Sequence, residues 1–201
     1  MAYVTHDDLL FAVRAYPSLQ GLRLVPIGVV FLAKVPFDMA WPGHSYLKQT
    51  VGALILLAAL AGFFLAGVYY HRRFGRVEPR WGPLWGCLGL VAVGSLYLGF
   101  SYLDVLQSGL SFSSLFWACI CLACYIGSKG RRWYYLPMAV MFTALTVLSL
   151  TGMASPKGMA AGPGSLFNLA LGLFLVVGGV LDHRLLCALL AAPAVTEAQN
   201  D

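Results

Sequence analysis

Apolar residues fall in six long runs along this chain, and the polar residues gather in the short segments between the runs. Each run is about as long as the roughly 20 apolar residues that a helix needs to cross a bilayer. The runs are continuous rather than alternating, which argues against the short strands of a membrane β-barrel. The pattern predicts six transmembrane helices, at about residues 22–41, 49–70, 84–102, 110–126, 136–153 and 165–181.

The segment before the first run, residues 5–19, predicts a helix of a different kind. Leu9 and Val13 recur at helical spacing, Arg14 follows them, and Pro17 is expected to end the helix. This segment is too short and too polar to cross a bilayer. We therefore expect an N-terminal amphipathic helix that lies on the inner membrane surface.

Composition agrees with this pattern. The 201 residues are 60% hydrophobic and only 10% charged, with a mean hydropathy of +0.78. A typical soluble domain is about 25% charged, and a soluble fold of this size cannot remove so much apolar surface from water. The loops and tails leave no room for a separate soluble domain, so we expect residues 1–201 to form one all-α integral membrane domain.

The basic residues are distributed unequally between the two sides of the predicted spans. With a cytoplasmic N-terminus, ten Lys and Arg residues fall on the inner side, while Lys48 and Lys157 fall outside. Cytoplasmic loops carry such an excess of basic residues, so the sequence predicts a multi-pass protein of the cell (plasma or inner) membrane with both termini cytoplasmic. The same orientation explains the net charge of +5 without nucleic acid as a partner. The inner residues are Arg14, Arg23, Arg72, Arg73, Arg76, Arg80, Lys129, Arg131, Arg132 and Arg184.

Lys34 and Asp38 are ionisable residues within the first predicted span. They are four residues apart, so they share a helix face and can pair. Because an ionisable group is costly in lipid, this pair indicates a functional polar pocket. The alternative is structural: Asp38 lies three residues from Trp41 and reaches the outer interface, with Lys34 as its counter-ion.

Two inner loops are candidates for binding anionic lipid headgroups or a cytoplasmic partner. Each basic residue beside the inner leaflet attracts anionic lipid by about 1 kcal/mol. The simpler interpretation is that these residues only fix the orientation of the chain. The candidates are Arg72, Arg73, Arg76 and Arg80 in the first loop, and Arg131 and Arg132 in the second.

A further candidate is the cluster Asp182, His183 and Arg184 at the cytoplasmic end of the sixth span. Asp182 and Arg184 can form an interfacial ion pair, and His183 can titrate near neutral pH. His71 follows the second span at a similar depth, but the spacing does not require the two histidines to share a metal. We predict no metal site, and the sequence leaves the identity of any cofactor open.

Small residues at two places predict close helix contacts. Ala58, Gly62 and Ala66 recur every four residues in the second span, and Gly178 and Gly179 are adjacent in the sixth. Small side chains allow helix backbones to approach closely. These residues indicate packing and not chemistry.

The sequence favours a non-catalytic function. It contains no glycine-rich phosphate loop, no H-E-x-x-H and no G-x-S-x-G motif, so we do not expect an enzyme. Spans two to six hold few polar residues, whereas a pore-lining bundle normally has more. We expect a subunit or scaffold of a larger membrane complex, in contact with membrane lipids and with other membrane or cytoplasmic subunits.

The order of a surface helix, six spans, two inner termini and a structured loop after the second span is similar to that of the permeases of ABC-2-type exporters. In those permeases the first inner loop touches an ATPase subunit. The resemblance covers topology only, because this chain is shorter and its loop 154–164 is too small for the re-entrant helices of those proteins. No residue role is carried over. The resemblance implies an alternative function as a transport subunit energised by a separate partner, with Lys34 and Asp38 near its path.

Overall fold

The computed structural model describes residues 6–40, 46–75, 83–106, 110–150 and 163–191. Every regular element in these ranges is a helix, and none of the residues in them lies in a β-strand. The all-α fold that the continuous apolar runs predict is therefore confirmed.

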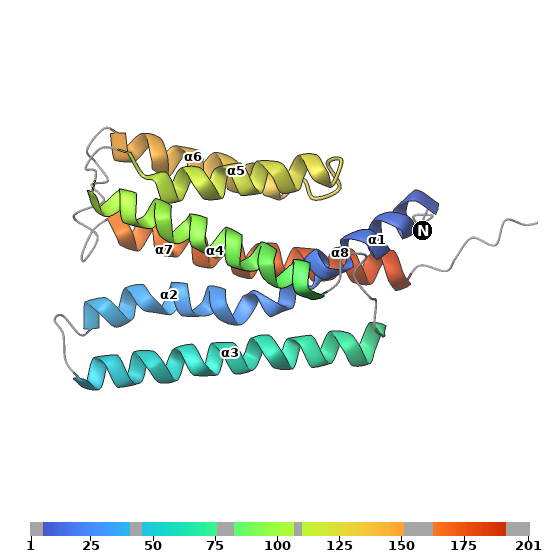
Figure 1. Ribbon diagram of the computed structural model, residues 1–201, viewed down its shortest axis with the longest axis horizontal. Helices are drawn as coiled ribbons and strands as arrows, with labels where there is room; N and C mark the ends of the chain where they lie inside the picture. The colour runs from blue at the N-terminus through green and yellow to red at the C-terminus, as the bar shows by residue number, and fades with distance from the viewer. Residues whose placement is uncertain (1–5, 41–45, 76–82, 107–109, 151–162, 192–201) are drawn as a thin grey trace, which may run out of the picture.

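The long helices run side by side, each antiparallel to the one that follows it in the chain (Figure 1). The elements are α1 (His6–Leu19), η1 (Gly21–Arg23), α2 (Val25–Ala40), α3 (Tyr46–Phe74), α4 (Pro83–Leu106), α5 (Phe112–Gly127), α6 (Tyr135–Leu150), α7 (Pro163–Leu173), η3 (Phe174–Gly178) and α8 (Gly179–Ala191). η1 is a turn of 3₁₀-helix and η3 is a π-helical turn. Because no break separates α7, η3 and α8, they form one continuous rod.

Three helical stretches among the described residues are long and apolar enough to cross a membrane: Leu10–Asp38, Tyr46–Phe74 and Leu166–Leu190. The first of them contains the end of α1, η1 and most of α2. α5 and α6 are also apolar, but each has 16 residues, which corresponds to about 24 Å of helix. That is shorter than the hydrocarbon core of about 30 Å.

Two helix ends differ from the expected ones. Pro17 does not end α1 but lies inside it, and the helix continues to Leu19. A proline removes one backbone donor and crowds the carbonyl four residues earlier, and here α1 ends only two residues later. The sixth helix does not stop near residue 181 but continues in α8 to Ala191. The apolar residues after Asp182 therefore extend this helix.

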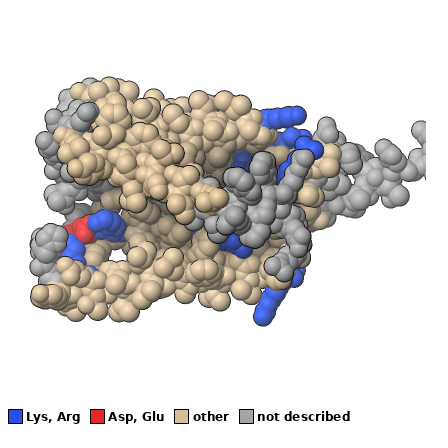
Figure 2. Space-filling model, viewed as in Figure 1, with Lys and Arg blue, Asp and Glu red and all other residues tan. Residues whose placement is uncertain are grey.

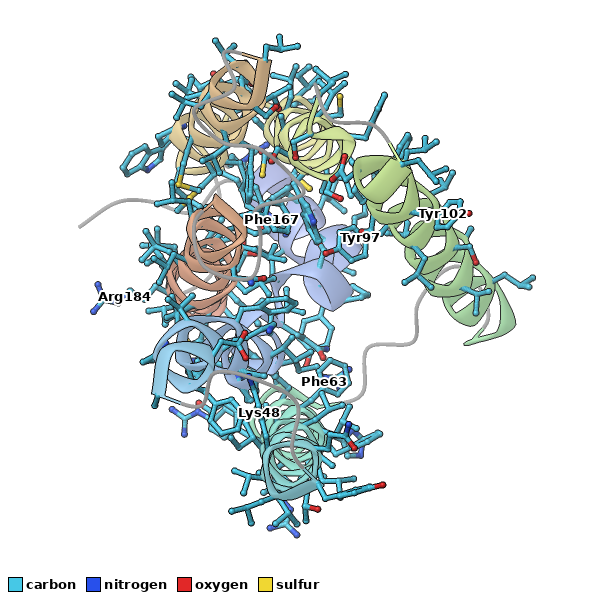
Figure 3. All side chains as sticks on the ribbon, turned by 90° about the vertical axis from the view of Figure 1, so that its left-hand side faces the viewer. Lys48, Phe63, Tyr97, Tyr102, Phe167 and Arg184 are labelled. Carbon is cyan, nitrogen blue, oxygen red and sulfur yellow. The ribbon has the colours of Figure 1, made fainter. Side chains whose placement is uncertain are left out.

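An aromatic core joins α5, α6 and the α7–η3 part of the rod. The ring of Trp117 on α5 lies 6.4 Å from Phe142 on α6 and 5.7 Å from Phe174 in η3. Phe167 points into the bundle from α7 (Figure 3) and contacts Phe142 at 6.2 Å. Such ring contacts add to the free energy gained by burying apolar area. The core of the fold therefore lies among these helices.

Two pairs of glycines allow α2 and the turn before it to approach the rod closely. A Cβ on Gly28 would lie 2.9 Å from the carbonyl oxygen of Gly172, and one on Gly172 would lie 2.8 Å from the carbonyl oxygen of Gly28. The approach is closer still at the second pair, where a Cβ on Gly21 would lie 2.2 Å from the carbonyl oxygen of Gly179. Only glycine fits at such contacts without a shift of the backbone.

Not all of the small residues predicted to mediate close helix contacts do so in the structure. A Cβ on Gly62 would come within 2.9 Å of the ring of Pro26, so this glycine does support a close contact between α2 and α3. Gly179 has the same role against Gly21. Gly178 does not, because its Cβ would meet the ring of Phe174 at an ordinary distance of 3.7 Å.

Seen along the helices, the bundle forms an open arc with α3 and α4 at its two ends (Figure 3). α3 packs against α2 and η1, and α4 packs against α5. Their remaining faces carry widely exposed apolar side chains, including Leu65 at 69% and Leu98 at 68% of full exposure. Soluble monomers rarely expose apolar patches of this extent. These two helices therefore carry a large share of the exposed apolar side chains among the described residues.

Candidate functional site

Charged side chains gather at the two ends of the bundle in the view of Figure 2. We call the end that holds the C-terminus of α3, α8 and the α5–α6 turn the inner end. The opposite end, where α2 finishes and α3 begins, is the outer end. Basic residues dominate the inner end, whereas acidic and basic atoms lie together at the outer end. The two ends therefore differ in the charged groups that they carry.

Asp182 on α8 is the centre of a buried polar network at the inner end. Its carboxylate is only 1% exposed. Tyr134 donates a hydrogen bond to one carboxylate oxygen, and Tyr135 donates to the other at 2.8 Å. A buried carboxylate is stable only when such partners replace water. The two tyrosines therefore hold α8 against the start of α6.

Arg132 completes this network from the α5–α6 turn. Its Nε lies 3.3 Å from a carboxylate oxygen of Asp182, and the arginine side chain is almost fully buried. A terminal nitrogen of the guanidinium donates to the Ser18 hydroxyl at 2.7 Å, which extends the network to α1. The contact with Asp182 is ionic rather than a hydrogen bond, since Nε has no hydrogen-bond partner among the described residues. Arg132 therefore joins three parts of the chain.

The α5–α6 turn holds Arg132 in place through its own backbone. Lys129 and Gly130 both adopt a positive φ, of 51° and 78°, a conformation for which glycine has no steric penalty. The Ser128 hydroxyl accepts a hydrogen bond from the backbone N–H of Arg132 at 3.2 Å. The turn thus reverses the chain and directs the guanidinium inward. The same turn leaves Lys129 exposed.

Tyr134 keeps its proton in this environment. Burial raises the pKa of its phenol, and the negative charge of Asp182 and the hydrogen bond to it raise the pKa further. A phenol with a raised pKa remains a donor across the physiological range. Tyr134 is therefore suited to a structural hydrogen bond and not to proton transfer.

His183, the next residue on α8, belongs to a second network that reaches α3. Its Nδ1 lies 3.0 Å from the hydroxyl of Tyr70, which is fully buried. That hydroxyl accepts a hydrogen bond from the backbone N–H of Leu22 at 3.2 Å. The Sγ of Cys187 lies 3.6 Å from Nε2 of His183. Because Cys187 is one helical turn after His183, helix geometry alone explains their proximity.

Tyr16 fastens α1 to the end of α3. Its hydroxyl lies 3.3 Å from the carbonyl oxygen of Tyr70 and 3.4 Å from that of Gly75, and it can donate to either. Tyr16 also belongs to an apolar cluster that includes Leu186 and Leu189 of α8. The expected surface helix therefore buries one apolar face against the protein.

The other predicted inner residues are not brought together. Arg184 points away from the bundle, unlike the two residues before it (Figure 3). The ion pair expected between Asp182 and Arg184 is replaced by the pair with Arg132. Arg72 and Arg73 are exposed at the end of α3. The predicted candidates Arg76 and Arg80 lie outside the described residues.

Arg131 and Arg132 differ in what they can bind, although they are adjacent. Arg132 is buried and cannot contact a lipid headgroup. Arg131 lies over the ring of Phe11 at 5.0 Å and lines a hollow of about 460 Å³ with Arg14 and Lys129. Three basic residues therefore line one hollow at the inner end.

The predicted pair of Lys34 and Asp38 does form at the outer end. The Lys34 ammonium donates a hydrogen bond to the Asp38 carboxylate, and the Nζ of Lys48 lies 3.0 Å from the other carboxylate oxygen. Lys48 comes from the start of α3 and lies between α2 and α3 (Figure 3). The three side chains line one pocket of about 430 Å³, which we call the outer pocket. Its complete lining is Val30, Ala33, Lys34, Phe37, Asp38, Lys48, Gln49, Gly52, Ile55 and Leu56.

The buried polar groups at the inner end are used in contacts within the protein. Within the described ranges, no three His, Cys, Asp or Glu side chains come close enough to hold a metal ion. Asp182 uses both carboxylate oxygens in structural contacts, and His183 is held by Tyr70. The outer pocket instead combines charged groups with an apolar wall, which is typical of a binding site.

Comparison with protein-family models, with curated proteins and with solved structures finds no match for this chain.

The sequence predicted the candidate residues but not the side chains that they contact in the structure. Lys48 was expected only as an outer loop residue, and Arg132 only as an inner surface residue. Tyr134 and Tyr135 were not singled out. An aromatic pair directly after a basic loop is a weak signal, because aromatic residues are common at membrane interfaces. These partners come from different helices, so their contacts depend on how the helices pack side by side.

Proposed function

We propose that this chain is a six-span protein of the cell membrane with both ends in the cytoplasm, and that it serves as a non-catalytic subunit or scaffold of a larger membrane complex. The observation that carries this proposal is the contrast between the inner end and the long faces. The buried polar groups at the inner end, centred on Asp182, are engaged with each other, while α3 and α4 expose long apolar faces.

Membrane insertion is supported by how the apolar and charged residues are arranged in space. The exposed apolar side chains of α3 and α4 occur along the lengths of both helices. Most of the described basic side chains lie at the inner end of the bundle, and Lys34 and Lys48 lie at the outer end (Figure 2). Lipid is the solvent that removes the cost of such apolar faces. The basic end then faces the cytoplasm.

The buried polar groups at the inner end support a role as a scaffold, because they connect different segments of the chain. Asp182, Arg132 and Ser18 connect α8, the α5–α6 turn and α1. Hydrogen bonds and ion pairs between buried groups of distant segments restrict the movement of those segments. Such an inner end gives other subunits a fixed frame, with the exposed apolar faces available to lipids and neighbouring helices.

The outer pocket favours the alternative function, a permease-type transport subunit energised by a separate partner. Lys34 and Asp38 line an open space between α2 and α3 rather than a filled contact. In this alternative, the exposed Arg72 and Arg73 at the inner end are candidates for contact with an ATPase subunit.

The first experiment tests insertion and orientation. In a background with the native cysteines replaced by serine, single cysteines are introduced as Lys48→Cys and Lys129→Cys. A membrane-impermeant thiol reagent is expected to label residue 48 in intact cells. Residue 129 is expected to react only after the membrane is opened. Labelling of both positions in intact cells contradicts the proposed orientation.

The second experiment tests the functional class. The full chain is purified from its native membrane in mild detergent, and its partners are identified by mass spectrometry. A stable multi-subunit assembly supports the scaffold, and an ATPase in fixed ratio supports the permease. A chain that leaves the membrane without any partner contradicts both.

A further inference from the structure

The outer pocket combines an excess of positive charge with an apolar wall. Its lining contains two lysines, Lys34 and Lys48, against a single acidic residue, Asp38. Asp38 contacts both ammonium groups and so neutralises one of the two charges. Half of the Lys34 side chain remains exposed, and an ammonium group has three N–H donors. The charge balance therefore fits one anionic group.

The rest of the lining is suited to hydrocarbon. Val30, Ala33 and Phe37 contribute from α2, and Ile55 and Leu56 contribute from α3. The volume of about 430 Å³ lies within the range of roughly 300–1,000 Å³ that is usual for small-molecule sites. A ligand that fits both parts has an anionic head and an apolar body.

The pocket opens on a side of the bundle. Figure 1 and Figure 2 share one view, in which α2 and α3 run across the page, and the charged atoms at the outer end are visible in a hollow of that face. The viewer therefore looks into the hollow across the helix axes. In an inserted protein this direction is the plane of the membrane, so lipid has direct access to the pocket.

We infer that the outer pocket binds one anionic phospholipid, whose headgroup phosphate contacts Lys34 and Lys48 and whose acyl chains lie along the apolar lining between α2 and α3. This inference rests on the proposed membrane insertion. It holds for the scaffold and for the permease alike. The site is distinct from the basic hollow at the inner end, and it belongs to the opposite leaflet.

Gly52 provides a way to close the pocket without disturbing the fold. It lines the pocket on α3, and a Cβ added there meets no atom within 4 Å. A leucine at this position projects into the ligand space, and it is a better helix former than glycine. Gly99 on α4 has the same open surroundings but lies outside the pocket, so Gly99→Leu is a matched control.

The test uses native mass spectrometry of the full chain in mild detergent, with dioleoyl phosphatidylglycerol and dioleoyl phosphatidylcholine as probes. The unaltered chain is expected to bind one phosphatidylglycerol about tenfold more tightly than phosphatidylcholine, from two lysine contacts. Lys34→Gln with Lys48→Gln is expected to remove this preference. Gly52→Leu is expected to weaken binding of phosphatidylglycerol, and Gly99→Leu is not.

Three results overturn the inference. The first is equal affinity for the two lipids. The second is an unchanged preference in both the double lysine variant and Gly52→Leu, with circular dichroism confirming that each is folded. The third is displacement of the lipid by millimolar glycerol phosphate, which identifies the ligand as a soluble anion. Flotation with vesicles after an alkaline wash separates these failures from a failure of membrane insertion, since an inserted chain without lipid preference contradicts only the pocket assignment.

Discussion

Gly21 and Gly179 face each other so closely, where η1 crosses α8, that each occupies the space that a side chain on the other would need. A Cβ on Gly21 would lie 2.2 Å from the Gly179 carbonyl oxygen, and a Cβ on Gly179 would lie 2.5 Å from the Gly21 carbonyl oxygen. The contact is between two backbones, so neither side can yield by changing a rotamer. The approach of η1 to the rod therefore depends on both glycines.

Gly179→Ala is expected to lower the free energy of unfolding by about 1–3 kcal/mol, the usual cost of overpacking a core. Reversible unfolding in mixed detergent micelles measures this change. Gly178→Ala is the matched control, because the added Cβ there meets Phe174 at an ordinary 3.7 Å. Equal losses in the two variants contradict the proposed backbone contact.

Removal of either member of the buried ion pair is expected to be costly. Asp182→Leu leaves the Arg132 charge without its partner, and Arg132→Met leaves Asp182 with only its two tyrosines. Each single change is expected to lower the free energy of unfolding by about 3–5 kcal/mol.

The double variant of this pair is expected to lose less than the sum of the two single losses, with a coupling of about 1–3 kcal/mol. The reason is that no unpaired charge then remains buried. The same unfolding assay completes the double-mutant cycle. Additive losses contradict a direct interaction between Arg132 and Asp182.

Tyr70→Phe tests the network that joins α3 to α8. The change removes the hydroxyl that accepts from Leu22 N–H and contacts Nδ1 of His183. An unsatisfied buried group costs about 1–3 kcal/mol. Tyr69→Phe, at the neighbouring and more exposed tyrosine, is expected to change stability by much less. Similar melting temperatures of the two variants contradict a structural role for the Tyr70 hydroxyl.

The outer ion pair is expected to contribute little to stability. Lys34 and Asp38 are half and about one-third exposed, and exposed pairs contribute about 0.2–1 kcal/mol. Asp38→Asn is therefore expected to leave the melting temperature nearly unchanged. A loss as large as that of Asp182→Leu contradicts the assignment of the outer pair to binding rather than to folding.

Much of the helical framework could be predicted because it depends on local patterns. The second apolar run predicts residues 49–70, and α3 spans Tyr46–Phe74. The pairing of Lys34 with Asp38 was also predictable, since one helical turn separates them. In both cases the information lies within a few consecutive residues.

The long-range partners could not be predicted in the same way. The contact of Arg132 with Asp182 depends on how the α5–α6 turn lies against the rod, and several other arginines were equally plausible partners. Lys48 reaches Asp38 only because α3 returns alongside α2. The residues were visible in the sequence, but their distances depend on helix packing that no short pattern encodes.

The hydrogen bonds of Tyr16 have a consequence for how the protein meets bilayers of different thickness. Tyr16 joins α1 to the end of α3. In the proposed orientation, α1 therefore cannot move with the inner leaflet independently of the bundle. Hydrophobic mismatch must then be relieved elsewhere, by tilt of a long helix. The 29-residue α3 is held at its inner end by the hydrogen bonds of Tyr16 and Tyr70. Its outer end is joined to α2 by the ion pair of Lys48 with Asp38 and by the contact of Lys48 with the Phe37 ring. A thinner bilayer is therefore expected to swing the outer end of α3 relative to α2, and so to change the width of the pocket between them.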